Sequence, residues 1–326
     1  MTAAVVKTRD ESYDFIKGIL IFLVVWGHAI QFADGADCWN NPIYVWIYSF
    51  HMPIFFVISG HFAKKSLESN FFSCVKSKTK RLLVPALFWT SVAIVLAVFV
   101  RHEHAYWHIL LNSVHNMWFL YCLWGMFVLG NIVWHFKHKL FMSLFLAVFF
   151  ITVYPFHSVD IFKGIQFTRQ WPEFLIGVFL LPYVNFYMTG WKRIHFIWIP
   201  LVVLYLIWFY LAGIQNDSAW MFSSDNYLIR IFVQIVSTII FFNIFYILSK
   251  YINEKIKRCI CYLGSLSMGI YVLHGCFMKL YVDFVGNVPV NVFVSFALSI
   301  LVCALCVGAV LLIRRVKFLK MVVLGE

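Results

Sequence analysis

The sequence predicts an all-α fold: a polytopic transmembrane helical bundle of about ten spans with both termini in the cytoplasm. Three observations predict it: the composition, the long apolar runs, and the positions of Lys and Arg. Hydrophobic residues make up 63% of the 326 residues and charged residues only 12%, against about 25% charged in a soluble domain. Continuous apolar runs favour helices over a membrane β-barrel, whose strands alternate over about ten residues. No segment is long enough to form a separate soluble domain, so we expect residues 1–326 to be one integral membrane domain.

The first two spans are predicted at about 15–33 and 44–63. The connection 34–42 contains Asp, Gly, Asn and Pro but no basic residue, which is typical of an outside loop. Pro53 and Gly60 in the second span predict a kink, because proline removes a backbone hydrogen bond.

The segment 64–81 follows the second span and holds six basic residues, the densest charge in the chain. We expect it to be a cytoplasmic loop. Alternation from there predicts the remaining spans, of which the fifth is short because Pro155 ends it. These spans lie near 83–100, 117–134, 140–154, 171–188, 194–212, 227–249, 260–282 and 291–313.

The basic residues are distributed asymmetrically between the two sides of this bundle. Twenty of the 26 Lys and Arg residues fall in alternate segments, which the positive-inside rule places in the cytoplasm. This placement explains the net charge of +12 without nucleic acid, so we expect no nucleic-acid partner. The six others are Arg101, Lys163 and Arg169 in outside loops and Lys17, Arg230 and Lys279 within spans.

Two cysteine and histidine patterns have metal-like spacing, but neither predicts a metal site. Cys303 and Cys306 lie in an apolar helix, where small-residue packing explains them. His102, His104 and His108 lie in one predicted outside loop without an evident fourth ligand. The eight cysteines are otherwise scattered and indicate no disulfide framework.

The first span carries a polar stripe. Lys17 and His28 are eleven residues apart, which is three helical turns plus about 20°, so both project from one face. Asp14 falls within about 40° of the same face. Lipid cannot solvate these groups, so the stripe is expected to face protein or water.

His28 is the first catalytic candidate. An imidazole buried at low dielectric is held neutral and suits a general base. The alternative is that His28 has a structural role and forms a hydrogen bond that packs its helix against a neighbouring helix. Lys17 alone could equally extend its amine to the membrane surface.

Five segments, in order, form a larger pattern: Asp14-x-x-Lys17-Gly18 with His28; Phe50-His51-Met52-Pro53 with Phe55-Phe56 and Ser59-Gly60; Lys80-Arg81-Leu82-Leu83-Val84-Pro85; Met117-Trp118-Phe119-Leu120; and Leu263-Gly264-Ser265-Leu266-Ser267 with Tyr271 to His274. The pattern resembles the membrane acyltransferase 3 family, which includes fucose 4-O-acetylase-like proteins. It covers residues 14 to 274, nearly the whole chain. Each motif alone is weak, whereas five in order are specific.

Three residues depart from the family pattern. Lys17 stands where arginine is commoner, which keeps the charge but loses the bidentate fork. His61 replaces a usual aromatic residue, and Glu173 occupies a usually apolar position. None of these changes removes the proposed base.

The resemblance implies an integral membrane O-acyltransferase, and we expect the transferred group to be acetyl. The implied co-substrate is cytoplasmic acyl-CoA, most often acetyl-CoA, and no bound cofactor is expected. The implied acceptor is a hydroxyl of a surface glycan or a lipid-linked sugar, so the reaction modifies a polysaccharide. We expect the protein to reside in the lipid bilayer of a bacterial cytoplasmic (inner) membrane.

The same resemblance suggests roles for single residues. His28 is the catalytic base or a transiently acylated nucleophile, with Lys17 and Asp14 beside it; Asp14 is as well explained by a structural ion pair. Lys17 and Arg81 would bind the phosphates of the acyl donor at the basic inner face. Ser59 is alternatively explained by close helix packing with Gly60, and Pro53 by a kink. The acceptor-binding or site-lining candidates are His51, Ser59, Trp118, Tyr271 and His274.

Two other functions compete with this interpretation. Another acyl group, such as succinyl, is the alternative within the family. A transporter or flippase for a lipid-linked sugar is the alternative from another class. Asp14, Glu173 and Asp283 all lie near predicted span ends, whereas coupled carriers usually bury carboxylates near the midplane. The sequence therefore favours the acyltransferase.

Overall fold

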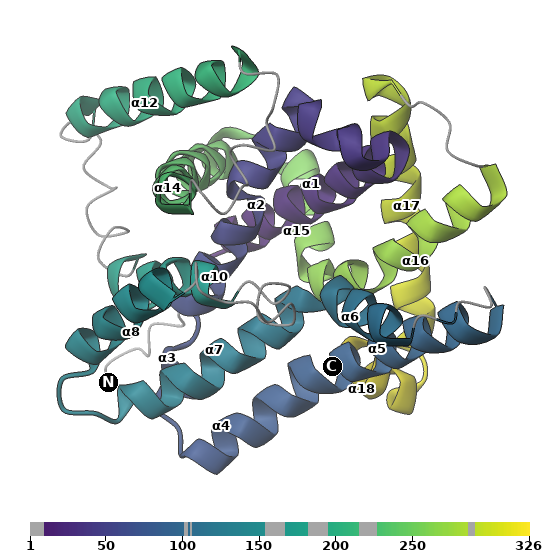
Figure 1. Ribbon diagram of the computed structural model, residues 1–326, viewed down its shortest axis with the longest axis horizontal. Coiled ribbons are helices and arrows are strands. Elements are labelled where there is room, and N and C mark those ends of the chain that lie inside the picture. The colour runs from purple at the N-terminus through teal and green to yellow at the C-terminus, as the bar shows by residue number, and fades with distance from the viewer. Residues whose placement is uncertain are drawn as a thin grey trace, which may run out of the picture.

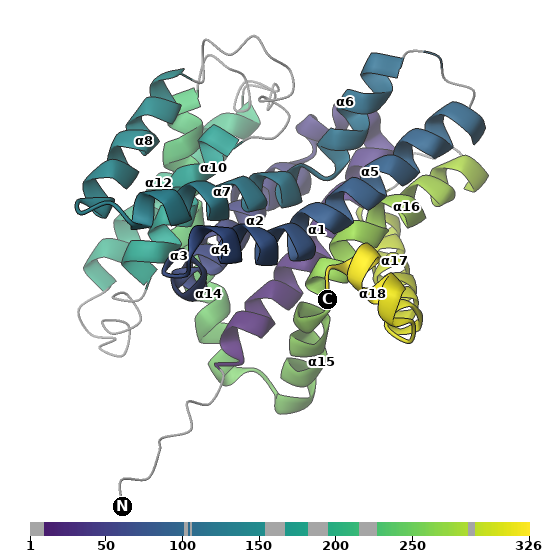
Figure 2. The same cartoon turned by 90° about the horizontal axis from the view of Figure 1, so that it is seen from below.

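The computed structural model describes residues 10–100, 104, 106–153, 167–181, 195–214, 227–285 and 291–326. All its regular elements are helical, with no strand in these ranges, so the predicted all-α class is confirmed. Figure 1 shows the helices gathered around α1 (Ser12–Asp34) and α2 (Pro42–His61). Figure 2 shows the same bundle from below.

Helix α1 is the centre of the bundle. Its buried apolar side chains include Phe15, Ile16 and Leu20, each 0% exposed. The helix contacts α2 and four helices from the second half of the chain. These four are α14 (Tyr227–Tyr251), α15 (Glu254–Ser265), α16 (Ser267–Val285) and α17 (Val292–Ile313).

Two glycines let α1 and α15 touch backbone to backbone. A Cβ atom on Gly18 would overlap the carbonyl oxygen of Ile260, and one on Gly264 would overlap that of Asp14. Small residues at such crossings give membrane helices their close packing. Glycines of the first and the last predicted motif are therefore partners in one helix contact.

Helix α2 keeps its polar backbone satisfied although Pro53 lies inside it. Asn41 caps the start of the helix by accepting from the backbone N–H of Ile43 at 3.0 Å. Pro53 has no N–H to donate to the carbonyl of Ser49, four residues earlier. The hydroxyl of Ser237, on α14, donates to that carbonyl at 2.7 Å instead, as an apolar bilayer requires.

A second pair of glycines joins α2 to α10 (Phe167–Leu175) and η5 (Ile176–Leu180). A Cβ on Gly60 would overlap the carbonyl oxygen of Phe174, and one on Gly177 would overlap that of Val57. Packing thus accounts for Gly60 in the Ser59-Gly60 motif.

The segment 64–81, expected as a loop, is largely helical. Asn70 accepts from the N–H of Phe72 at 3.0 Å and starts α4 (Phe71–Lys78). A continuous helical run then extends to Phe99, because Lys, Arg and Leu are strong helix formers. Its parts after α4 are η2 (Thr79–Leu83), α5 (Val84–Val95) and η3 (Leu96–Val100), and α3 (Lys64–Leu67) precedes it.

Two predicted spans are bent. Helices α6 (Tyr106–Asn116) and α7 (Trp118–Trp134) meet at 68°, and α15 and α16 meet at 74°. The predicted span 260–282 therefore consists of the end of α15 and most of α16. The bends fall at Met117 and Leu266, and neither residue is a Gly or Pro that would signal a break.

Five described helices are long and apolar enough to cross a membrane, or up to seven if each bent pair is one span. The apolar helices α8 (Lys139–Val153) and α12 (His195–Ile214) match two further predicted spans. The count of ten and the cytoplasmic termini stay predictions. Several residues behind them lie outside the described ranges: Lys7, Arg9, Arg101, Pro155, Lys163, Lys192 and Arg193.

We expect Gly264→Ala to lower the free energy of unfolding by about 1–3 kcal/mol, the usual cost of overpacking. The added methyl has no room against the Asp14 carbonyl. The control is Gly308→Ala on α17, where nothing lies within 4 Å of the added atom. Thermal melting of the detergent-purified proteins tests this, and equal melting temperatures would contradict it.

The predicted topology places the exposed Lys76 in the cytoplasm. A Lys76→Cys variant with the eight native cysteines replaced should resist a membrane-impermeant maleimide in intact cells. It should react after the cells are permeabilised. Labelling in intact cells would refute the topology.

Candidate active site

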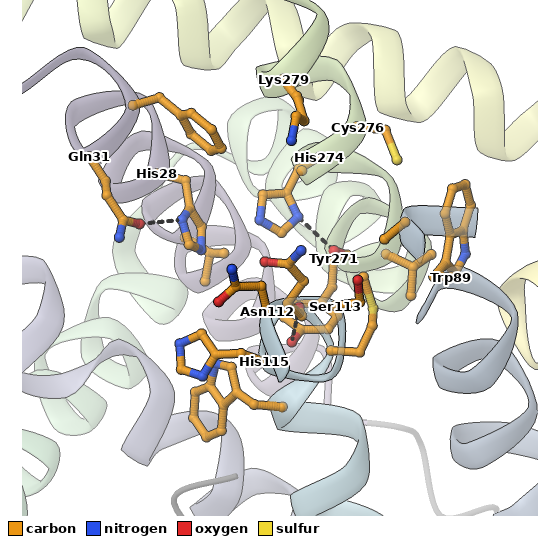
Figure 3. Close-up of a pocket in the computed structure, with 18 of the residues that line it drawn as sticks. His28, Gln31, Trp89, Asn112, Ser113, His115, Tyr271, His274, Cys276 and Lys279 are labelled. Atoms are coloured by element: carbon orange, nitrogen blue, oxygen red, sulfur yellow. Dashed lines mark hydrogen bonds between the residues drawn. The ribbon is translucent and has the colours of Figure 1, made fainter. Parts of the chain in front are cut away.

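A cavity of about 1050 Å³ opens between α1, α2, α5, α6 and α16. Its volume is at the upper end of the range for small-molecule sites. Figure 3 shows polar side chains from α1, α6 and α16 converging on it. The polar and charged residues on its wall are His28, Gln31, Tyr44, Tyr48, His51, Asn112, Ser113, His115, Asn116, Arg169, Gln170, Gln234, Tyr271, His274 and Lys279.

Helix α1 contributes one face to the cavity. Val24, His28 and Gln31 follow a spacing of four and three residues, which aligns side chains on one side of an α-helix. Lys17 belongs to the same stripe, seven residues before Val24. The predicted polar stripe thus faces protein, and its C-terminal half lies on the cavity.

His28 is oriented by Gln31. Its Nδ1 lies 2.9 Å from Gln31 Oε1, so with the amide in this orientation Nδ1–H donates to the oxygen. The proton then sits on Nδ1 and the lone pair on Nε2, because a neutral imidazole carries one proton. His28 is half-buried because it faces the cavity. Its Nε2 has the electronic form of a general base.

Two further histidines lie close to His28 and share this tautomer. His51 Nδ1 donates to the carbonyl of Ile47 at 2.6 Å, and His274 Nδ1 donates to that of Tyr271 at 2.6 Å. The ring centroids of His28 and His274 are 4.9 Å apart. Carbonyl oxygens only accept, so both rings carry the proton on Nδ1 and leave Nε2 basic.

Tyr48 links His28 to His51. Its ring centroid lies 6.4 Å from that of His28 and 4.7 Å from that of His51, both edge-on. The cavity wall holds a fourth histidine, His115, and geometry alone does not single out His28 among the four imidazoles.

Five of the nine predicted site residues line this cavity. They come from four helices and from opposite ends of the sequence, and the fold brings them together. They are His28, His51, Trp118, Tyr271 and His274.

Asp14 and Lys17 lie outside the cavity wall. Lys17 Nζ is 2.6 Å from Asp14 Oδ1, so the ion pair allowed by their spacing is present. The Lys17 side chain is 24% exposed. Seven residues separate it from Val24, or about 10 Å along the helix, so Lys17 lies below the cavity on the same stripe.

Arg81 and Ser59 are also off the wall. Arg81 is exposed in η2, which packs against α4, α5, α7 and α18 (Lys317–Leu324). Ser59 is half-buried in α2 beside the packing residue Gly60. The structure thus does not join Arg81 to the cavity that holds the histidines.

Several wall residues were missed by sequence reasoning. His115 and Asn116 immediately precede the Met117 motif, and Gln31 is one turn beyond His28. A polar residue on the stripe of His28 was the available signal for Gln31. The sequence also contained a signal for Lys279, because a lysine within a membrane span is a functional candidate.

Glu173 lies further inside its helix than the predicted span start at residue 171 implies. It lies inside the helical run that begins at Phe167 and is 0% exposed. Its carboxylate oxygens have no hydrogen-bond partner, and Arg169 interacts with it electrostatically from one turn earlier. The sequence argument against a carrier therefore loses one support, and Asp283 lies at a position whose side chain is not described.

Cys38 lies on the wall in η1 (Gly35–Asn40), the connection between α1 and α2. Burial raises the pKa of its thiol above the ordinary value. The thiol is therefore protonated at neutral pH, which is the unreactive form. Within the described part of the chain, no three His, Cys, Asp or Glu residues are grouped to hold a metal ion; His102 lies outside it.

Fold and cavity together define a helical membrane protein with a histidine-lined site of enzyme-like size. A protein-family model described as an acyltransferase domain matches residues 10–313 of the sequence. The chain belongs to the membrane acyltransferase 3 family, as the motifs predicted, and is an integral membrane protein. This result favours the acyltransferase over the flippase or transporter.

Two curated relatives match part of the chain. Nodulation protein NolL of Sinorhizobium fredii is 36% identical over 135 residues, or 39% of this chain and 37% of the relative. Nodulation protein NolL of Mesorhizobium japonicum is 42% identical over 90 residues, or 26% of this chain and 24% of the relative. The matches thus span well under half of these relatives. No solved structure matches the chain.

Proposed function

We propose that this protein is an O-acetyltransferase that moves an acetyl group from cytoplasmic acetyl-CoA to a hydroxyl of a glycan. The observation that carries the proposal is the cavity in which His28, correctly oriented for a base, meets His51, His274 and Trp118. Acyl-CoA is a co-substrate, and the proposal needs no bound cofactor.

The reaction follows from the form of His28. The unprotonated Nε2 accepts the proton of the acceptor hydroxyl as that oxygen attacks the thioester carbonyl. A carbon–oxygen bond forms, the carbon–sulfur bond breaks, and the thiolate of CoA takes the proton back from the imidazolium. Gln31 keeps Nδ1 protonated throughout by accepting its hydrogen bond at 2.9 Å.

A covalent route uses the same atoms differently. Nε2 of His28 attacks the thioester, the thiolate leaves, and the hydroxyl then takes the acetyl group from the acyl-imidazole. The positions of His51 and His274 supply a second base for that step. The general-base route needs one histidine and the covalent route two.

The acceptor side is proposed from the chemistry of the wall. Trp39 and Trp118, both half-buried, offer aromatic side chains, and Asn112 and Asn116 offer amides. Aromatic faces pack on the apolar side of sugar rings, and amides both donate to and accept from hydroxyls. A carbohydrate, free or lipid-linked, fits such a wall. Other acyl groups, succinyl among them, are the alternative within the family.

The donor side is proposed at the inner end of α1. Lys17 lies about 10 Å below the cavity on the stripe of His28, so a donor bound there points its thioester toward His28. Arg81 is a second donor candidate in the basic segment at this end. We place the protein in a bacterial cytoplasmic membrane, where acetyl-CoA lies on one side and surface glycans on the other.

His28→Ala should lower acetylation of cell-surface glycans by at least the factor of about 10²–10⁴ usual for a general base. Mass spectrometry of glycans from cells with the wild-type or variant gene measures it. Fractionation of membranes checks insertion, and size-exclusion chromatography in detergent checks that the variant is folded and not aggregated.

His51→Ala and His274→Ala are the matched controls for that experiment, because both remove a neutral imidazole from the same wall. In a covalent mechanism, the variant that lacks the second base should accumulate an acetyl group on His28. Wild-type acetylation by a well-expressed His28→Ala protein would contradict the role of His28.

Lys17→Met should raise KM for acetyl-CoA by about tenfold or more, because a hydrogen bond to a charged group contributes about 1.5–3 kcal/mol. Lys17→Arg keeps the charge and should stay active. Assays of acetyl transfer in isolated membranes measure both variants. An unchanged KM in Lys17→Met would remove Lys17 from the donor site, and Lys137→Met, at an exposed lysine, controls for loss of a positive charge.

A further inference from the structure

One side of the cavity is apolar, which the acetyl transfer itself does not require. This side lies between α16 and the helical run of α5 and η3, and Figure 2 shows α5 and α16 side by side. The wall residues of α5 and η3 recur every three or four positions, which places them on one helix face. They are Trp89, Val92, Ala93, Leu96 and Ala97. The apolar wall residues of α16 are Val272, Gly275, Cys276 and Leu280. We call this part of the cavity the apolar lobe.

The apolar lobe and the histidines belong to one cavity. Figure 3 shows Trp89 and Cys276 on the side of the cavity away from His28 and His115. Among the described wall residues of α5, η3 and α16, Lys279 is the one with a charged side chain. An apolar wall offers no partner to a polar group, and burial of an unpartnered polar group is costly. A cavity with one polar side and one apolar side therefore fits an amphiphilic ligand.

Gly275 leaves room in the apolar lobe. A Cβ atom built on Gly275 meets nothing within 4 Å, whereas one on Gly18 or Gly264 would overlap the backbone of a neighbouring helix. Close helix packing therefore does not explain Gly275. Its missing side chain enlarges the cavity one residue after His274, whose ring lies next to that of His28.

The apolar lobe reaches the surface of the bundle. Leu96 and Leu280 line the cavity and are also 41% and 50% exposed. Val95 and Phe99, in the same helical run as Leu96, are exposed as well, as expected for side chains that contact bilayer hydrocarbon. A hydrocarbon chain in the bilayer can thus enter the lobe at Leu96 and Leu280 without crossing the polar side of the cavity.

The proposed donor does not account for the apolar lobe. An acetyl group brings only a methyl, and the arm of CoA contains amides that an apolar wall would leave without hydrogen-bond partners. A donor that binds at Lys17 approaches the cavity along α1 and needs no opening toward lipid. The lobe is therefore available to the acceptor.

We propose that the acceptor sugar is carried on a hydrocarbon chain, which lies in the apolar lobe while the sugar faces the histidines. This inference rests on the proposed acetyl transfer to a glycan and selects the lipid-linked form of the acceptor. The chain is the polyprenyl group of a sugar phosphate or the acyl chains of a glycolipid. Both present the same hydrocarbon to the wall.

Acceptors with and without their chain test the proposal. The full-length protein is reconstituted in phosphatidylcholine liposomes, since detergent would itself occupy an apolar lobe, and labelled acetyl-CoA is the donor. The acceptor is a chloroform–methanol extract of cells that lack the gene, either intact or with its sugars released. Wild-type protein should acetylate the intact extract about tenfold or more faster than the same amount of released sugar, because the chain raises the effective concentration at the membrane.

The release step identifies the chain. Mild acid frees sugars from polyprenyl phosphates, whereas mild alkali removes ester-linked acyl chains. The treatment that removes the acceptor activity of the extract therefore shows which of the two chains the protein uses.

A glycine variant assigns the preference to the apolar lobe. Gly275→Leu places a side chain in the lobe and should lower the ratio of transfer to intact over released acceptor by about tenfold, within the usual range for overpacking. Gly308→Leu on α17 is the matched control and should keep the ratio, because an added Cβ atom there also meets nothing within 4 Å.

Equal transfer by wild-type protein to intact and released acceptor would overturn the proposal, and this comparison needs no variant to fold. Transfer to the insoluble envelope glycan alone would overturn it as well. A Gly275→Leu protein that slows both transfers equally would indicate a structural role. If it instead slowed transfer only when octanoyl-CoA replaces acetyl-CoA, the lobe would hold the acyl chain of the donor; either result overturns the proposal. Wild-type protein that acetylates none of the three acceptors would overturn the proposed function instead.

Discussion

The whole bundle depends on enclosing one polar stripe. Helix α1 carries Asp14, Lys17, His28 and Gln31 on a face that hydrocarbon cannot solvate. Five helices surround it, and α15 comes close enough for backbone contact only because Gly18 and Gly264 have no side chains. Near the N-terminal end of α1 the enclosure is tight, and Lys17 forms an ion pair with Asp14 of the same helix. Toward the C-terminal end of α1 the same stripe borders a cavity instead.

The three histidines show how local bonds prepare a site inside an apolar medium. His51 and His274 are tied to carbonyls four and three residues back in their own helices, and His28 is tied to Gln31 three residues on. Each tautomer is therefore fixed within one helix turn and needs no partner helix. The rings keep a basic nitrogen without carrying charge, which avoids the cost of a buried cation. Long-range packing then only has to bring the three helices together.

The sequence was sufficient to predict the properties that depend on amino-acid composition and on the spacing of residues along a helix. The all-α class, the stripe on α1 and the family followed from apolar runs, an eleven-residue spacing and five ordered motifs. The bend at Met117 could not be predicted, because no Gly or Pro lies beside it, whereas Gly264-Ser265 beside the bend at Leu266 was a signal that the sequence analysis did not use. The helical nature of segment 64–81 was missed because its charge density was taken as a loop signal, although those residues are good helix formers. Arg81 was predicted as a donor residue from its family motif and its charge, and the sequence could not show that it lies off the cavity wall.

The separation of Lys17 from the cavity has a mechanical consequence for acyl transfer. Leu20 and Ile21 lie on α1 between Lys17 and Val24 and are 0% and 1% exposed, so the face between Lys17 and the proposed base His28 is closed by packing. An acyl arm that reaches His28 along this face has to part α1 from a neighbouring helix. The tightest neighbour, α15, is held by backbone contact at Gly264 and has little freedom to yield. Movement of α16, which joins α15 at the 74° bend and carries His274 and Lys279, would open the path and shift two wall residues together. Arrival of the donor and arrangement of the acceptor pocket would then be coupled through one helix.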